Sequence, residues 1–181
     1  IKLRLFGGWA YDTGLCSDPG WLAKADDGGV PMGSALTPPP SGSTAPRFVV
    51  RAEWDPGTEA VPGAKLSHLQ IIKGWLDADG KAHQKIITVA GKSDSKLDAN
   101  TETCAPPSGG QESLCAVFTD DDWQPGQRAL WYARVIELPT CRWSTRTCNA
   151  LPDSEKPSAC TDPKIAKTVK QRAWSSAIWS S

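Results

Sequence analysis

Short stretches of the chain alternate apolar and polar residues, which is the pattern of half-buried β-strands. In residues 1–5 the odd positions are Ile or Leu and the even positions are Lys or Arg, and residues 47–54 alternate in a similar way. Successive side chains of a strand point to opposite faces, so each stretch predicts a strand with one face on a core. A further short strand is predicted over residues 115–119.

The clearest signal is a hairpin in residues 66–91. Two runs rich in β-branched and aromatic residues flank Asp77-Ala78-Asp79-Gly80. Asp-Gly between two such runs is a strong hairpin signal, because glycine adopts the positive φ of a tight reversal at little cost. We therefore expect antiparallel strands over 67–76 and 82–90, with other strands pairing to their edges or packing over them.

The C-terminal half predicts two more strands. Residues 128–138 are apolar on both faces, which indicates a strand near the middle of the sheet system. Residues 173–180 predict a last strand, with Trp174 and Ile178 on one face and Trp179 on the other.

Helix signals are few. Asp18 followed by Pro19 has the pattern of an N-cap and a first helical position, which predicts a helix of one or two turns from there. Thr161-Asp162-Pro163 could cap a second short helix over residues 163–170.

Long loops separate these elements and suit the composition, since the chain holds 16 glycines and 15 prolines. Roughly seven short strands joined by turns favour a mainly β fold, an antiparallel β-sandwich of the immunoglobulin-like or a related kind. We expect residues 1–181 to form a single such domain with long loops, one or two short helical turns and disulfides. The predicted loops are 28–46, 92–114 and 140–161.

The charge balance excludes some function classes. Lys plus Arg equal Asp plus Glu at 20 each, which gives no reason to expect nucleic acid or a membrane surface as a partner. No apolar run approaches the roughly 20 residues that span a bilayer. The sequence opens on a strand already under way and without Met, so we expect a C-terminal fragment of a longer or processed protein.

Six cysteines lie among Ser, Thr, Pro and Gly and form no Cys-x-x-Cys pair. This pattern favours disulfides over a zinc site, and hence an oxidising location, the periplasm or the cell exterior. Among the connectivities that six cysteines allow, we favour Cys104–Cys115 and Cys141–Cys148, which would close short loops, and by elimination Cys16–Cys160.

Nine tryptophans are the most unusual compositional feature. Exposed indoles could stack on sugar rings, as in a secreted carbohydrate-binding module. Trp54, Trp75, Trp131 and Trp174, however, fall in strand patterns, where packing in the core is the ordinary use of the side chain. We therefore favour core or interface roles and keep the ligand-binding module as the alternative.

Few residues offer metal chemistry. His68 and His83 fall toward opposite ends of the predicted hairpin, roughly 20 Å or more apart at about 3.3 Å per residue, so they cannot share a metal there. Asp77-x-Asp79-Gly80 and Asp120-Asp121-Asp122 carry oxygen ligands. The first lacks the downstream residues of an EF-hand loop and the second runs into Trp-Gln-Pro-Gly, so both fit turns better.

Catalytic motifs are absent from the sequence. No serine stands in a Gly-x-Ser-x-Gly elbow, and no phosphate-binding loop or dinucleotide fingerprint occurs. We predict no catalytic residue, no metal ligand and no cofactor in this chain.

A collinear set of motifs covers most of the chain. Its segments are Phe6-Gly-Gly-Trp9, Gly29-Val-Pro-Met-Gly33, Gln70 to Gly80, Arg128 to Pro139, Arg142-Trp143-Ser144 and Gln171 to Trp179. Together they resemble the C-terminal third of a bacterial family of long proteins of unassigned function. The earlier part of those proteins is similar to the polymerase-and-histidinol-phosphatase (PHP) metal-dependent hydrolases.

The resemblance implies that this chain follows a hydrolase domain whose metal ligands lie outside it. The chain would then be a non-catalytic accessory domain that packs on the hydrolase domain. We expect Trp9, Arg142 and Trp143 to make that contact, because each offers a large area or a fixed donor fork in a Gly- or loop-rich setting. Residues 119–125 depart from the family's pattern, so no shared polar role is assigned to that loop.

Overall fold

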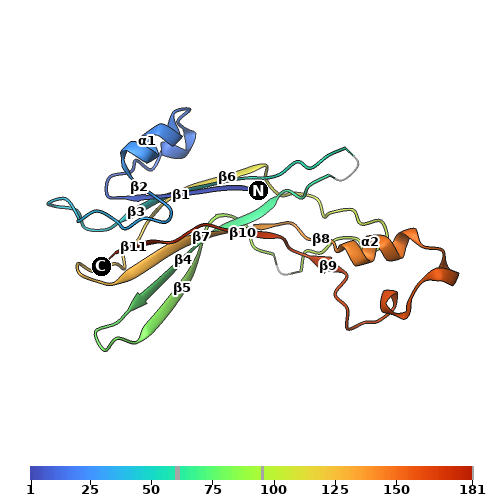
Figure 1. Cartoon of the computed structure of the whole chain (residues 1–181). Coiled ribbons are helices and arrows are strands. Elements are labelled where there is room, and N and C mark those ends of the chain that lie inside the picture. Colours follow the sequence, from blue (N-terminus) through green and yellow to red (C-terminus); the bar gives the residue numbers. More distant parts are fainter. Residues whose placement is uncertain (60–61, 95, 181) are drawn as a thin grey trace.

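The computed structural model describes residues 1–59, 62–94 and 96–180, in which two antiparallel sheets pack face to face (Figure 1). The small sheet has the strand order β2-β1-β3-β6. Its strands are β1 (Lys2–Gly8), β2 (Gly29–Pro31), β3 (Arg47–Glu53) and β6 (Ser113–Thr119).

The large sheet has the order β10-β7-β4-β5, and β11 also pairs with β7. The predicted hairpin is confirmed, with the Gly80 backbone at φ 78° and its N–H donating to the Asp77 carbonyl. The strand that is apolar on both faces is β7, and it lies inside the sheet as predicted. The strands are β4 (Leu66–Leu76), β5 (Ala82–Gly91), β7 (Ala129–Glu137), β10 (Arg172–Trp174) and β11 (Ile178–Ser180).

One hydrophobic core fills the space between the sheets. Phe48 and Val50 face inward from the small sheet, and Leu69, Ile71 and Trp131 face inward from the large one; all are fully buried. Successive side chains of these strands point to opposite faces, so Phe48 and Val50 enter this core while Val49, between them, is buried on the other side of the small sheet. The predicted mainly β, antiparallel sandwich-like fold is confirmed.

A second, smaller core lies on the outer face of the small sheet, under η1 (Leu15–Ser17) and α1 (Trp21–Asp27) (Figure 1). Tyr11 is buried there and its hydroxyl donates to the Ala25 carbonyl at 2.6 Å. The predicted helix is real but begins later than expected, after Gly20. The Asp18 carboxylate accepts a hydrogen bond from the Gly20 N–H in the preceding turn, so it caps no helical N–H.

Residues 140–169 form a lobe that extends beyond the ends of the sheets (Figure 1). The lobe corrects two predictions: the expected loop 140–161 contains a helix, and the helix expected over 163–170 is not formed. Instead, Thr168–Val169 pairs with Thr140–Cys141 as a short ladder. The lobe consists of β8 (Thr140–Cys141), α2 (Trp143–Ala150), η2 (Asp153–Glu155), η3 (Ser158–Cys160) and β9 (Thr168–Val169).

The sequence pattern did not predict α2, because this helix has no continuous apolar face. Among its residues only Thr145 is buried, and the Thr145 hydroxyl donates to the Lys167 carbonyl at 2.7 Å. The Asn149 amide donates to the carbonyls of Thr101 and Glu102. Specific links to other segments, rather than helical periodicity, hold α2 in place.

The predicted last strand is interrupted. Ser175 leaves the strand alignment, and its hydroxyl accepts a hydrogen bond from the Ala133 N–H at 2.9 Å. This break divides the segment into β10 and β11. Trp174 and Trp179 are consequently both exposed while Ile178 is fully buried, so the predicted grouping of Trp174 with Ile178 is wrong.

All six cysteines form disulfides, but the pairing predicted from short loops is wrong. The bridges are Cys16–Cys115, Cys104–Cys141 and Cys148–Cys160. Cys148–Cys160 does close a short loop, with a sequence separation of 12, whereas the other two bridges join segments 99 and 37 residues apart. The first ties η1 to β6, the second ties the loop before β6 to β8, and the third ties α2 to η3.

A buried ion pair connects the two sheets. Lys73 in β4 is 2% exposed, and its ammonium lies 2.7 Å from Oδ2 of Asp120, the residue that follows β6. The Trp131 indole N–H donates to the same oxygen at 2.9 Å. The Lys73 ammonium also lies 5.3 Å from the centre of the Trp75 ring, a cation–π distance.

Replacing Lys73 with Met should destabilise the protein by about 3–5 kcal/mol, because it leaves the Asp120 carboxylate buried without a counter-charge. Urea unfolding monitored by tryptophan fluorescence measures the change. The control is Lys85→Met, which breaks the exposed pair of Lys85 with Asp122 and should change stability little. Equal stability of both variants would contradict a central role for the buried pair.

Removing the Cys16–Cys115 bridge with a double Ser variant should lower the free energy of unfolding by about 5 kcal/mol. The bridge spans a sequence separation of 99, and the loop-entropy model assigns such a closure that magnitude. Peptide mapping without reduction should also recover the three linked pairs. Recovery of a Cys104–Cys115 peptide instead would contradict the structure.

Candidate functional site

A groove of about 600 Å³ opens where the sandwich meets the lobe. The loop before β4, the end of β7 and the start of α2 form its walls. The residues that line it are Pro62, Gly63, Ala64, Glu137, Thr140, Cys141, Arg142, Trp143, Ser144, Arg146, Val169 and Gln171.

The floor of the groove carries a buried acid, Glu137. It occupies the last inward-facing position of β7, in the same column as Trp131 and Val135, and is 8% exposed. Within the described part of the chain its carboxylate makes no hydrogen bond or ion pair. Burial raises the pKa of Glu137; the amino group of Ile1 opposes this shift and Asp55 adds to it.

The rim of the groove is aromatic and basic. Trp143, the first residue of α2, is 74% exposed, which is unusual for so large an apolar side chain. Arg142 and Arg146 lie on the same side of the groove, one turn of helix apart. Neither guanidinium forms an ion pair or a side-chain hydrogen bond with any described residue.

Several links fix the rim relative to the floor. The Arg142 N–H donates to the Lys167 carbonyl, and the Cys104–Cys141 bridge holds β8 next to the start of α2. The Glu137 N–H donates to the Gln171 carbonyl, which anchors the last wall. The groove is therefore built from ordered backbone on three sides.

A second exposed surface is the outer face of the large sheet, defined here by Ile86, Leu130, Tyr132, Trp174 and Trp179. Register places these side chains on one face: Trp179 lies opposite Leu130, and Tyr132 and Ile86 both lie opposite Ile72 of β4. Four of them, Tyr132 excepted, are between 39% and 56% exposed. Exposed apolar surface of this kind often marks a contact site.

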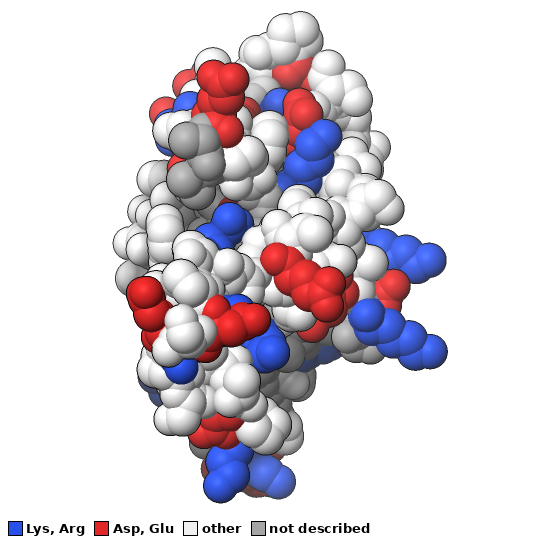
Figure 2. All heavy atoms as spheres, turned by 90° about the vertical axis from the view of Figure 1, so that its right-hand side faces the viewer, with Lys and Arg blue, Asp and Glu red and all other residues white. Residues whose placement is uncertain are grey.

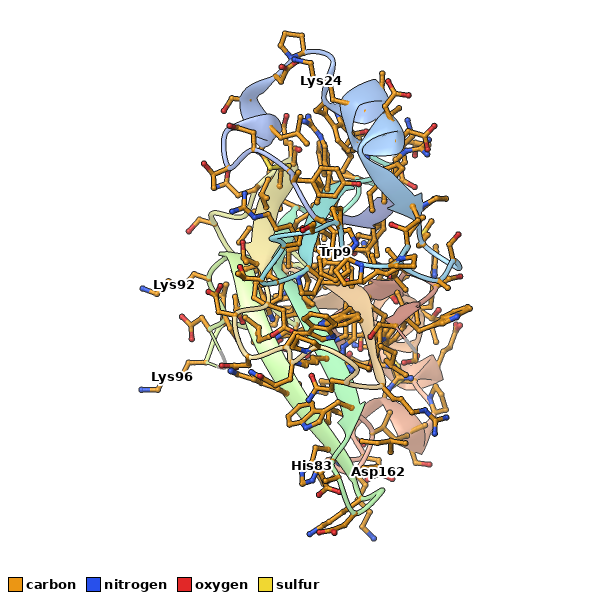
Figure 3. All side chains as sticks on the ribbon, turned by 90° about the vertical axis from the view of Figure 1, so that its left-hand side faces the viewer. Trp9, Lys24, His83, Lys92, Lys96 and Asp162 are labelled. Atoms are coloured by element: carbon orange, nitrogen blue, oxygen red, sulfur yellow. A yellow bond between two sulfur atoms is a disulfide. The ribbon has the colours of Figure 1, made fainter. Side chains whose placement is uncertain are left out.

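Of the three predicted contact residues, only Arg142 and Trp143 come together. Trp9 lies elsewhere, in the middle of the molecule, as Figure 3 shows. Its indole packs edge-on against Trp123 at 5.3 Å between ring centres, and its N–H donates to the Thr37 carbonyl. Trp9 is thus half-buried and already engaged within this chain.

The two histidines lie far apart in the hairpin, as predicted. His83 faces Trp75 near the turn (Figure 3), whereas His68 pairs with Gly91 at the other end. His83 stacks on Trp75, and its Nε2 lies 2.7 Å from the Asp77 carboxylate. That hydrogen bond holds the pKa of Asp77 below its usual range. Burial, chiefly, lowers the pKa of His68.

Both acidic motifs form turns. The Asp77 carboxylate accepts hydrogen bonds from the N–H groups of Asp79 and Lys81, and the Trp123 N–H donates to the Asp120 carbonyl. Asp120, however, is also the buried partner of Lys73, a role that the turn pattern did not indicate. In residues 1–59, 62–94 and 96–180, no three His, Cys, Asp or Glu side chains form a group that could hold a metal ion.

Sequence analysis missed Glu137, although a signal for it exists. The run from Arg128 to Leu138 alternates around Trp131 and Val135, which places Glu137 on the inward face. An acid at an inward position of a central strand is uncommon and indicates either an ion pair or a site.

Comparison with known proteins yields a family but no function. A family model described as a protein of unknown function (DUF3604) matches residues 1–181. No curated protein and no solved structure matches the chain. None of the helices in the described residues is long and apolar enough to cross a membrane.

Replacing Glu137 with Gln should stabilise the protein near neutral pH. Because its pKa is raised above 4.5 in the folded state, Glu137 contributes stability when protonated, and that stability is lost as the pH rises through the raised pKa. Gln is uncharged at every pH, so the stability of the variant does not fall in this way as the pH rises. Thermal unfolding from neutral pH down to about pH 4 should show the advantage of the variant shrinking toward zero.

The matched control is Glu102→Gln, at an exposed position, which should show no such pH-dependent advantage. A Glu137→Gln variant less stable than the parent protein at neutral pH would mean that the carboxylate has a stabilising partner in solution.

Proposed function

Because the chain belongs to the DUF3604 family of proteins of unknown function, we propose that it is a non-catalytic accessory domain of a longer protein in that family. It docks on the remainder of that protein, the hydrolase-like part that the sequence resemblance implies. The three disulfides support a periplasmic or extracellular location for the whole assembly.

The observation that carries this proposal is the outer face of the large sheet. Two tryptophans, a leucine and an isoleucine are exposed on it, with Trp179 directly opposite Leu130, and the nearby Arg134 guanidinium donates to the Gln70 side chain at 2.7 Å. A face that presents several large aromatic and aliphatic groups favours a permanent intramolecular contact over a transient one. We therefore propose that another domain of the same longer polypeptide covers this face.

The groove rim is the other surface considered for docking. Arg142 and Trp143 were expected to contact the preceding domain, and they remain exposed in this chain. The rim is small and charged, with a buried acid beneath it, so it suits a ligand better than a domain interface. We therefore assign docking to the outer face.

Hydroxyl-radical footprinting tests the docking surface by comparing this chain with the longer protein. Trp174 and Trp179 should be oxidised readily in the isolated chain and protected in the longer protein, because docking buries their indoles. Trp143 is the internal control and should react equally in both. Protection of Trp143 alone would move the contact to the groove, and protection of none would contradict docking.

The non-catalytic part of the proposal is tested with the isolated chain. With divalent metals added, it should not hydrolyse phosphoesters. A phosphoesterase activity that co-purifies with this chain and that a chelator abolishes would contradict an accessory role.

A further inference from the structure

We propose that the groove between the sandwich and the lobe is a saccharide-binding site, with Trp143 as the stacking platform and Glu137 as the buried hydrogen-bond acceptor. This inference is independent of the docking proposal, because the groove and the outer face of the large sheet share no residue.

The first argument is the state of Glu137. Glu137 is 8% exposed and its carboxylate makes no hydrogen bond with any described residue, so the desolvation of this group is costly and the amino group of Ile1 offsets it only in part. The carboxyl borders an open groove, so a ligand can supply the missing hydrogen bonds. The described residues supply no hydrogen-bond donor to the Glu137 carboxylate at the floor of the groove.

The second argument is the mixture of charges around the groove. An anion such as phosphate would meet the Glu137 carboxylate, and a simple cation would meet Arg142 and Arg146. Seen from the lobe side, the surface carries acidic and basic side chains interspersed, with neither sign dominating (Figure 2). A hydroxyl group both donates and accepts, so a polyhydroxylated ligand can satisfy the acid and the guanidinium groups together.

The third argument is geometric fit. Carboxylate and guanidinium groups are planar and each binds two neighbouring partners at once, which suits adjacent hydroxyls of a sugar ring. Trp143 presents an indole that is 74% exposed, and the apolar C–H face of a pyranose packs well on such a ring. A groove of about 600 Å³ has room for a short saccharide.

The fourth argument is rigidity. The Cys148–Cys160 bridge and the hydrogen bond from Thr145 to Lys167 hold α2, and the Cys104–Cys141 bridge holds β8. The platform and the acceptor therefore keep their separation without a ligand, so binding costs little ordering of the protein.

The experiment uses the 181-residue chain and a glycan microarray that carries neutral and uronic-acid-containing oligosaccharides. The best soluble glycan is then titrated while the indole N–H signals are followed by ¹H–¹⁵N NMR. The Trp143 indole signal is assigned as the one that is absent from the spectrum of the Trp143→Ala variant. We expect this signal to shift as the glycan is added to the parent protein. Trp143→Ala should abolish binding, and Glu137→Gln should weaken it about tenfold, the effect of losing one hydrogen bond to a charged group.

Trp174→Ala is the matched control, since it removes an exposed indole from the other surface and should leave binding unchanged. Glu137→Gln is expected to be more stable than the parent, so its weaker binding cannot come from unfolding. Binding of either neutral or acidic glycans supports the site if the variants have these effects. A preference for the uronic-acid glycans would show that Arg142 and Arg146 recognise a negative charge.

Three results would overturn the proposal. They are silence across the array, binding that survives Trp143→Ala, and an equal shift of the Trp143 indole signal with inorganic phosphate or an unrelated short peptide.

Discussion

The ion pair between Lys73 and Asp120 is the interaction on which the rest of the structure depends. Each sheet supplies one of the charges, and the indole of Trp131 donates to the same carboxylate oxygen. A charge buried without its partner is strongly unfavourable, so sheet arrangements that separate the two are excluded. Hydrophobic packing alone tolerates sliding of one sheet over another, whereas this hydrogen-bonded pair does not.

The position of β7 follows from this constraint. Trp131 is the third residue of that strand, so fixing its indole at the start of the strand fixes the direction in which the rest of it runs. Glu137 then reaches the open end of the sandwich, on the floor of the groove. The opposite side of the same strand carries Leu130 and Tyr132 to the outer face. One central strand thus supplies both candidate surfaces, and its alternation keeps their chemistry separate.

Disulfides hold the parts of the chain that lack a core of their own. The lobe buries few side chains, so hydrophobic burial contributes little to its order. The Cys104–Cys141 and Cys148–Cys160 bridges replace that contribution by restricting the unfolded chain. This arrangement allows Trp143 and Arg142 to stay exposed on a rigid base, as a binding rim requires.

The sequence by itself determined the local features. The Asp-Gly turn, the central strand with two apolar faces and the antiparallel sandwich class all follow from alternation and turn chemistry, which act over a few residues. The tertiary structure alone decided the cysteine pairing, the exposure of Trp174, the pairing of Asp120 with Lys73 and the burial of Glu137. Each of these depends on which distant segment covers a residue; the local alternation of β7 places Glu137 on the inward face but does not show what covers it.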